Sequence, residues 1–200
     1  MTIRVPDPPS KRALDLVLLL PTLPLFAIVT AGLAALVWIA DGRPVFFSQP
    51  RVGRGGRPFR IWKLRTMGTE PDPRDRRPTR VGAWLRARGL DELPQLFCVL
   101  TGHMSLVGPR PLTAEDNARL VARCSDFATR LRVRPGLTGL AQVCMAQGAA
   151  LTAALDSAYA RERGVIMDLQ ILARTLWMNL VGKRRGARRP VELSPRVGGP

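Results

Sequence analysis

The chain has 200 residues, of which 46% are hydrophobic, and a formal net charge of +16 from 31 Lys and Arg against 15 Asp and Glu. This length suits one domain, and the roughly 160 residues outside an apolar N-terminal segment are enough to bury a core. The three irregularly spaced cysteines exclude a readable disulfide framework or zinc site. The charge favours a polyanionic partner, namely nucleic acid, an anionic membrane surface or a phosphorylated substrate, although an Arg-rich composition is also typical of a GC-rich genome.

An apolar segment follows a Pro-rich tail at residues 1–10, and its 25 residues from Leu16 to Ala40 carry no charge. A run of this length can cross a bilayer as a helix, so residues 11–41 are predicted to form a membrane helix. Both flanks are basic, which places both ends in the cytoplasm by the positive-inside rule, and Pro21 and Pro24 would bend the helix. These features favour a re-entrant helix that enters and leaves the same leaflet; a single span is the alternative.

Residues 42–182 are predicted to form one α+β domain, and residues 183–200 a basic tail. Val45–Phe47 and Phe59–Met67 are β-type runs on either side of a Gly-rich turn, which predicts a short β-hairpin. In the second run, Lys63 and Arg65 share a face that we expect to be wet and cationic. A Pro-rich, charged surface loop follows at residues 68–80.

Most of the remaining domain is expected to be helical. Gly/Pro-rich segments at 106–112 and 132–142 separate these helices, and the second is expected to lead into an apolar strand. The last helix is amphipathic and is compatible with either a membrane interface or a core-packing role. The expected helices are 81–88, 90–100, 114–131, 151–163 and 165–181, and the apolar face of the last comprises Ile166, Leu169, Ala173, Leu176, Trp177 and Leu180.

Asp91 and Glu92 form an adjacent acid pair. Neighbours on a helix point about 100° apart, so the two carboxylates cannot bracket a sugar from opposite faces as a glycosidase pair does. One acid can face a reacting centre while the other faces a metal or a base. Asp91 also fits a helix N-cap, with Pro94 tolerated in the first turn, and spacing alone favours that simpler interpretation.

Several cations lie in or beside stiff Gly/Pro segments: Lys63, Arg65, Arg110 and Arg134. Rigid cations beside an acid pair suit a diphosphate, which the cations neutralise while an acid holds Mg²⁺. A solvated basic surface is equally compatible with this pattern.

Eight segments, taken in order, resemble the bacterial sugar transferase family, the small monotopic phosphoglycosyl transferases. The resemblance runs from about residue 11 to residue 182. The segments are Lys11–Asp15, Pro44–Phe47, Arg51–Gly53, Lys63–Met67, Leu90–Leu96, Met104–Leu112, Arg134–Val143 and Asp168–Leu172.

The resemblance implies transfer of a sugar 1-phosphate from a UDP-sugar to polyprenol (undecaprenyl) phosphate, which starts assembly of a surface glycan or glycoconjugate. It implies Asp91 as the nucleophile that forms a phosphosugar ester, Glu92 as its helper, and Mg²⁺ held by both acids. It also implies a monotopic protein of the bacterial inner membrane, with its catalytic domain in the cytoplasm and in contact with anionic lipid. Formation of homo-oligomers is compatible with this assignment, and no nucleic-acid partner is expected. The implied substrate-binding residues are Lys63, Arg65, Arg110, Pro111, Arg134 and Gln142.

The sequence departs from the family pattern in three places, one of which is the loop at residues 68–80, shorter than the resemblance leads us to expect. Ala27-Ile28 stands where a Ser-Pro pair is usual, so the bend of the membrane helix is not placed by the resemblance. The segment Cys144–Gln147 replaces an Asn-Gly-Arg run, so sugar specificity is not carried over. Asp156 and Tyr159 match the family pattern without a firm role. A basic membrane or nucleic-acid binding protein and a non-catalytic scaffold of the same family are the alternatives.

Overall fold

The computed structural model describes residues 8–72 and 74–181. Most of the expected N-terminal tail and the whole basic tail at 183–200 lie outside the described residues. Residues 9 and 10, which were assigned to the tail, already belong to the first helix.

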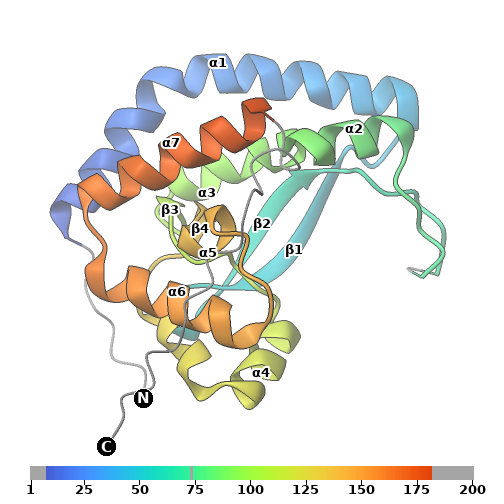
Figure 1. The fold of residues 1–200 in the computed structure, drawn as a ribbon. Coiled ribbons are helices and arrows are strands. Elements are labelled where there is room, and N and C mark those ends of the chain that lie inside the picture. Colours follow the sequence, from blue (N-terminus) through green and yellow to red (C-terminus); the bar gives the residue numbers. More distant parts are fainter. Residues whose placement is uncertain (1–7, 73, 182–200) are drawn as a thin grey trace, which may run out of the picture.

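Helix α1, Pro9–Asp41, is continuous through Pro21 and Pro24, and Figure 1 shows its axis changing direction in its N-terminal half. In the described part of the chain, it is the one helix long and apolar enough to cross a membrane by length and composition. A narrow stripe of α1 that includes Leu19 and Val37 is buried against the domain, whereas residues such as Val17 and Ile28 are exposed. The helix therefore lies along the domain with an apolar outer face.

The domain is a mixture of helices and two small sheets, which confirms the predicted mixture of α and β structure. The hairpin is confirmed: β1, Phe46–Val52, pairs antiparallel with β2, Pro58–Leu64, across the short turn η1, Arg54–Gly56. The expectation of an apolar strand after residues 132–142 is wrong, because Leu140–Val143 is helical. The strand of this region lies inside that segment, in a second sheet that was not predicted: β3, Ser105–Val107, pairs in parallel with β4, Gly136–Thr138. The backbones approach so closely here that a Cβ on Gly136 would collide with the backbone of Gly108.

The helices largely match their predicted positions. One expected helix, 114–131, is interrupted because Cys124 adopts an extended conformation with φ −152° and ψ 106°. The helical elements are α2 (Arg80–Arg88), η2 (Leu90–Gln95), α3 (Leu96–Leu100), α4 (Ala114–Arg123), η3 (Ser125–Arg132), α5 (Leu140–Val143), α6 (Ala149–Glu162) and α7 (Val165–Val181).

The N-terminal end of α1 is tied to the domain by two neighbouring cations. The ammonium of Lys11 is buried and lies 2.7 Å from Asp168 Oδ2 on α7. The guanidinium of Arg12 donates to the carbonyls of Val99 and Leu100 at the end of α3, at 2.6 and 2.8 Å. Lys11 therefore compensates a buried acid, and Arg12 donates hydrogen bonds to carbonyls that have no partner within their own helix.

The C-terminal end of α1 is tied to the same domain. The Arg65 guanidinium donates to the carbonyls of Asp41 and, at 2.9 Å, Gly42, and Thr79 donates to the Asp41 carboxylate at 2.8 Å. Arg65 is only 7% exposed, so the expectation of a wet environment for this side chain is wrong. It lies just past the end of β2 and turns to the unpaired carbonyls of a helix terminus.

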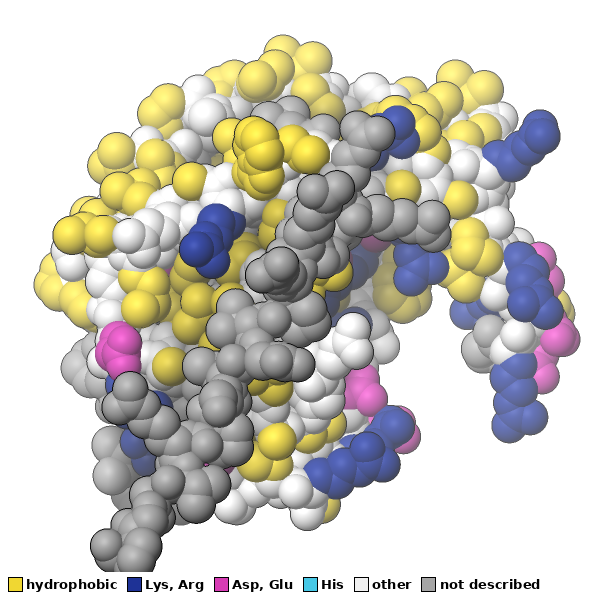
Figure 2. Space-filling view, viewed as in Figure 1, with side chains coloured by type: hydrophobic (Ala, Val, Ile, Leu, Met, Phe, Trp, Pro, Cys, Tyr) yellow, Lys and Arg dark blue, Asp and Glu magenta, His cyan; other side chains and the backbone are white. Residues whose placement is uncertain are grey.

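The apolar stripe of α7 faces outward. Ile166, Leu169, Leu176 and Trp177 are between 45 and 74% exposed, whereas Asp168 and Ile171 on the other side of the helix are buried. The core-packing alternative for this stripe is therefore wrong. Figure 1 shows α7 and α2 beside α1, and Figure 2 shows apolar side chains gathered over α1 and α7.

Candidate active site

The acid pair lies in η2, a tight turn that enters through the left-handed Gly89 (φ 69°). Gly89 occupies the cap position and no side chain caps this element, so the interpretation of Asp91 as a helix cap is wrong. Asp91 is 7% exposed, and η2 packs against the hairpin strand β2. A buried carboxylate that does not cap a helix is available for other chemistry.

Two cations converge on one oxygen of Glu92. Lys63 Nζ lies 2.6 Å and Arg110 Nη2 2.5 Å from Glu92 Oε1. Burial alone would raise the pKa of Glu92, but Arg110 and Lys63 together hold this pKa below its ordinary value. Glu92 is therefore firmly ionised and fixes both cations beside Asp91.

Asp91 shifts in the opposite direction. Burial raises the pKa of Asp91, with Glu92 adding to the rise, although the positive charges of Lys63 and Arg86 oppose it. Environments that separate the pKa values of two neighbouring acids are typical of functional sites. The structure thus distinguishes two carboxylates that the sequence presents as equals.

Two further cations near the acid pair, Arg51 and Arg86, were not predicted from the sequence. Together with Asp91, Glu92, Lys63 and Arg110 they form the charged cluster of the site. Arg51 donates to Gln49 Oε1 at 2.7 Å and to the Pro111 carbonyl at 3.4 Å, and burial and the nearby Arg110 lower its pKa. Arg86 acts on Asp91 from the last turn of α2. The available signal for Arg51 was its place in a family-like segment, whereas Arg86 resembled an ordinary exposed helix residue.

A cavity of about 810 Å³ begins at this cluster. Its volume is within the range of small-molecule sites. Glu92 and Arg110 line it together with Gln142, and apolar side chains from α1 and α7, including Phe26 and Leu172, complete it. The cavity thus joins the charged cluster to the two helices with exposed apolar faces.

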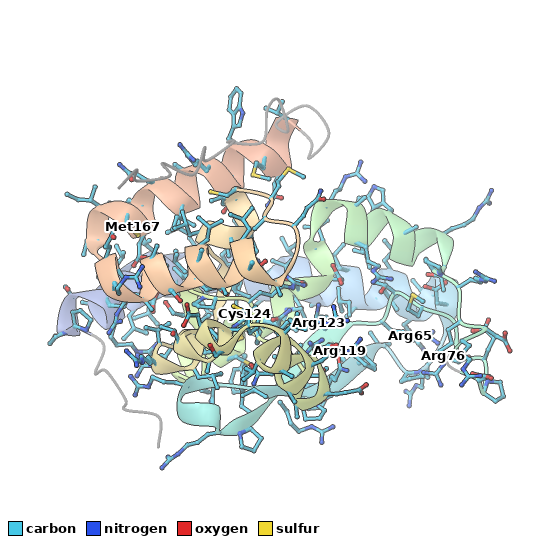
Figure 3. The ribbon with its side chains drawn as sticks, turned by 60° about the horizontal axis from the view of Figure 1, so that its bottom comes forward. Arg65, Arg76, Arg119, Arg123, Cys124 and Met167 are labelled. Carbon is cyan, nitrogen blue, oxygen red and sulfur yellow. The ribbon has the colours of Figure 1, made fainter. Side chains whose placement is uncertain are left out.

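The predicted substrate-binding residues divide into three groups. Lys63 and Arg110 meet at Glu92, Gln142 lines the cavity, and the Pro111 carbonyl holds Arg51. Arg134 is half-buried just before β4 and is not among the described residues that line the cavity. Arg65 lies apart at the end of α1; Figure 3 shows it beside the loop that carries Arg76, away from Met167 of α7.

A second acid, Asp156 on α6, lines the same cavity and faces Arg130 of η3 at 3.5 Å. Both side chains are buried, at 2 and 6% exposure. Burial raises the pKa of Asp156 to about 6 despite Arg130. Arg130 also donates to the backbone carbonyl of Arg110, so it supports the segment that carries the Glu92 partner.

The segment that departs from the family pattern also reaches the cavity. Met145, Ala146 and Gln147 contribute to its wall. Met145 has φ 51°, a left-handed conformation that is uncommon for a residue other than Gly, Asn or Asp. This irregular turn, rather than a regular element, shapes that part of the wall.

The acid pair offers two carboxylates to Mg²⁺, the cofactor that the resemblance implies. No group of three or more His, Cys, Asp or Glu side chains that could hold a metal occurs among the described residues. Mg²⁺ is commonly bound by one or two carboxylates, with waters and substrate phosphates as the other ligands. Asp91 and Glu92 fit that arrangement and do not fit an all-protein cage.

Comparison with known proteins gives a consistent result. The profile of the family described as bacterial sugar transferase matches residues 7–182. Over 181 residues the chain is 41% identical to a UDP-glucose:undecaprenyl-phosphate glucose-1-phosphate transferase of Caulobacter vibrioides, covering 83% of this chain and 68% of that protein. A protein of the same name from Escherichia coli is 37% identical over 188 residues, covering 86% of this chain and 40% of that protein.

Relatives differ in the sugar that their names specify. A UDP-N-acetylgalactosamine-undecaprenyl-phosphate N-acetylgalactosaminephosphotransferase of Aeromonas hydrophila is 39% identical over 141 residues, covering 66% of this chain and 33% of that protein. The chain therefore spans between 33 and 68% of the length of these relatives.

Proposed function

Given that this chain belongs to the bacterial sugar transferase family, we propose that it is a phosphoglycosyl transferase that moves a sugar 1-phosphate from a UDP-sugar to polyprenol phosphate. The observation that carries the proposal is the arrangement of Asp91 beside a Glu92 that is neutralised by Lys63 and Arg110. The relatives' names specify this class of reaction.

We propose that the transfer proceeds in two half-reactions. In the first, an Asp91 oxygen attacks the β-phosphorus of the donor, the bond from that phosphorus to the bridging oxygen breaks, and UMP leaves with the electron pair. In the second, an oxygen of polyprenol phosphate attacks the same phosphorus and Asp91 leaves as a carboxylate. Covalent catalysis divides the transfer between a soluble donor and a lipid acceptor into separate steps.

The environments of the two acids support this division of roles. Glu92 is held in ion pairs and is the weaker nucleophile because its charge is already compensated. Asp91, whose pKa is raised, gives a more basic carboxylate once it is ionised. Lys63, Arg110 and Arg51 lie where they can neutralise the donor phosphates, which would otherwise repel an anionic nucleophile.

We propose Mg²⁺ as the cofactor, held by Asp91 and Glu92 and completed by donor phosphate and water. When bound, the ion would supply further positive charge against the diphosphate. The chain's own residues then orient the donor and keep the attacking carboxylate ionised.

The anchor is proposed to be a re-entrant helix on one face of the bacterial inner membrane, with the catalytic domain in the cytoplasm. Its 33 residues would extend about 50 Å if straight, yet both ends bind the same domain through Lys11, Arg12, Arg65 and Thr79. These contacts at both ends with one domain support a helix whose two ends lie on the same side of the bilayer.

Exposed aromatic residues support a membrane-facing side. All four tryptophans are between 41 and 63% exposed, and three of them lie on helices α1, α2 and α7: Trp38, Trp84 and Trp177. Tryptophan is enriched at membrane interfaces, and the net charge of +16 would attract anionic lipid. Because Phe26 of α1 and Leu172 of α7 line the same cavity as Glu92, a lipid acceptor would approach the acid pair from this side.

The proposal is tested by UMP release from a panel of UDP-sugars with polyprenol phosphate and Mg²⁺. Without acceptor, the wild type is expected to gain the mass of one sugar phosphate, and Asp91→Asn neither to gain it nor to turn over. Glu115→Gln, which changes an exposed acid on α4, is the control and should behave as wild type. Full activity in Asp91→Asn would refute the assigned nucleophile, and no UMP release with any donor would refute the reaction.

The anchor is tested separately by labelling cysteines placed at residues 8 and 42 in intact inverted vesicles, on a background without the native cysteines. Equal access from the cytoplasmic side is expected. Access from opposite sides would refute the re-entrant helix without affecting the reaction.

A further inference from the structure

We infer that Asp156, together with Gln142, binds hydroxyl groups of the donor inside the cavity and that this contact contributes to donor specificity. The inference rests on the proposed function and adds to it a second, hydroxyl-binding wall that is distinct from the cationic cluster at Glu92. The family resemblance gave Asp156 no role.

One oxygen of the buried Asp156 carboxylate has no hydrogen-bond donor. Its side chain lines the cavity and is 2% exposed, yet Oδ2 accepts no hydrogen bond. The facing Arg130 Nη2 is 3.5 Å away and donates to the carbonyl of Arg110 instead. A buried carboxylate oxygen that accepts no hydrogen bond is costly. The ion pair with Arg130 offsets its charge but leaves room for a hydrogen-bond donor.

Gln142 contributes a second incomplete acceptor. Its Nε2 donates to the Leu137 carbonyl at 3.1 Å, which fixes the orientation of the amide. Its Oε1 is buried and also accepts no hydrogen bond, while the side chain lines the same cavity as Asp156. Two buried oxygens beside this largely apolar cavity therefore accept no hydrogen bond.

The chemistry of this wall selects among parts of the donor. A carboxylate and an amide oxygen would repel phosphate, which instead suits the cations Lys63 and Arg110. Hydroxyl groups donate to such acceptors without bringing charge into the cavity. A UDP-sugar has hydroxyl groups on its hexose and on its ribose, and either ring could place a hydroxyl against these oxygens.

Arg130 connects the two walls and is a positioning residue. Its guanidinium lies over the Phe127 ring at 4.6 Å, faces Asp156 and holds the Arg110 carbonyl. The side chain of that same Arg110 pairs with Glu92. Donor hydroxyls at Asp156 would therefore be bound at a fixed distance from the phosphates at the acid pair.

The test compares kcat/KM for UMP release with the preferred UDP-sugar and with analogues that each lack one hydroxyl, on the hexose or on the ribose. In the wild type, at least one analogue should react about ten-fold or more slowly because it leaves a buried acceptor unpaired. In Asp156→Ala, kcat/KM for the preferred UDP-sugar should fall, but the analogue that lacks that same hydroxyl should show no further decrease. The ring that carries the discriminated hydroxyl identifies which part of the donor Asp156 binds.

Matched variants separate binding from a general structural effect. Ser157→Ala changes the neighbouring buried residue, whose Oγ also has no hydrogen-bond partner. Ser157 is not among the described residues that line the cavity, so this variant should keep the wild-type ratio of kcat/KM between the UDP-sugar and its analogue. Asp156→Asn keeps an oxygen acceptor without charge and should give an intermediate ratio, since charge-assisted hydrogen bonds are about twice as strong as neutral ones. Gln142→Met should reduce discrimination against a hydroxyl without altering any charge.

The inference is overturned if the wild type does not discriminate between the donor and any analogue. It is also overturned if Asp156→Ala, or Asp156→Asn should the alanine variant not fold, keeps the full wild-type ratio. A wild type that releases no UMP from any donor would refute the proposed function instead, so the two failures are distinguishable.

Discussion

The ion pair between Lys11 and Asp168 gives a quantitative prediction about how α1 is held. Replacing Lys11 with Met removes an ammonium that lies 2.7 Å from Asp168 Oδ2, with the two side chains 7% and 0% exposed. Asp168 would keep one neutral neighbour, the Tyr159 hydroxyl at 2.9 Å. Lys11 also lies 3.9 Å from the buried Asp15. Removing one partner of a buried pair typically costs about 3–5 kcal/mol, so we expect a loss of at least about 3 kcal/mol.

This loss is a large part of the about 5–15 kcal/mol that stabilises a typical domain. For a chain of this length it corresponds to a fall in Tm of roughly 6–12 °C. Thermal unfolding of the purified protein in detergent measures the shift. Arg119→Met is the control because Arg119 pairs with exposed acids, and surface pairs contribute about 0–1 kcal/mol.

A double variant decides whether the unpaired charge is the cause. Lys11→Met with Asp168→Asn removes both charges and leaves an amide oxygen for Tyr159. We expect it to be more stable than Lys11→Met alone, because it leaves one buried acid, Asp15, without its cation instead of two. A double variant at least as unstable as the sum of the single variants, or a Lys11→Met shift no larger than that of Arg119→Met, would refute the reasoning.

Three further predictions address the other features. Burial raises the pKa of Asp156 from 3.8 to about 6, so the wild-type folded state holds an extra proton between these values and loses about 3 kcal/mol of stability as pH rises through this window. Asp156→Asn lacks this loss, so its stability relative to wild type should rise between about pH 4 and pH 7 in denaturant titrations, and parallel curves would contradict this. Arg110→Gln should raise the donor KM or lower kcat by about ten-fold or more, whereas Arg65→Gln should lower the Tm and leave the kinetics of the folded enzyme unchanged; a purely kinetic effect at Arg65 would restore it to the substrate site. In single-tryptophan variants, lipids brominated near the headgroup should quench Trp38, Trp84 and Trp177 on binding to anionic vesicles, and unquenched emission at all three would argue against the proposed membrane-facing side.

The site was predictable where function is encoded in local segments. The acid pair, Lys63 and Arg110 could be identified because each lies in a short segment that resembles the family. Their meeting at a single oxygen of Glu92 was not predictable, because it depends on how β2 and the segment after β3 pack against η2. The opposite pKa shifts of Asp91 and Glu92 likewise arise from that packing.

The errors have identifiable physical causes. Strand alternation placed Lys63 and Arg65 on one face, but β2 ends at Leu64, so the alternation does not extend to Arg65. The parallel pair β3–β4 has strands of only three residues in Gly/Pro-rich segments, too short for a period-two pattern. Asp156 and Arg130 belong to different elements 26 positions apart, and pairs of this kind are visible only after the chain has folded.

The polar contacts at its ends also fix how α1 is turned about its own axis. Lys11 and Arg12 point about 100° apart around the helix and bind different elements, α7 and α3. At the other end, Arg65 donates to the carbonyl of Asp41, the last residue of α1. A helix held at both ends in this way cannot roll. One residue inserted near its middle would turn one half by about 100° against the other, so the choice of side chains offered to lipid is made by ion pairs and hydrogen bonds outside the apolar segment.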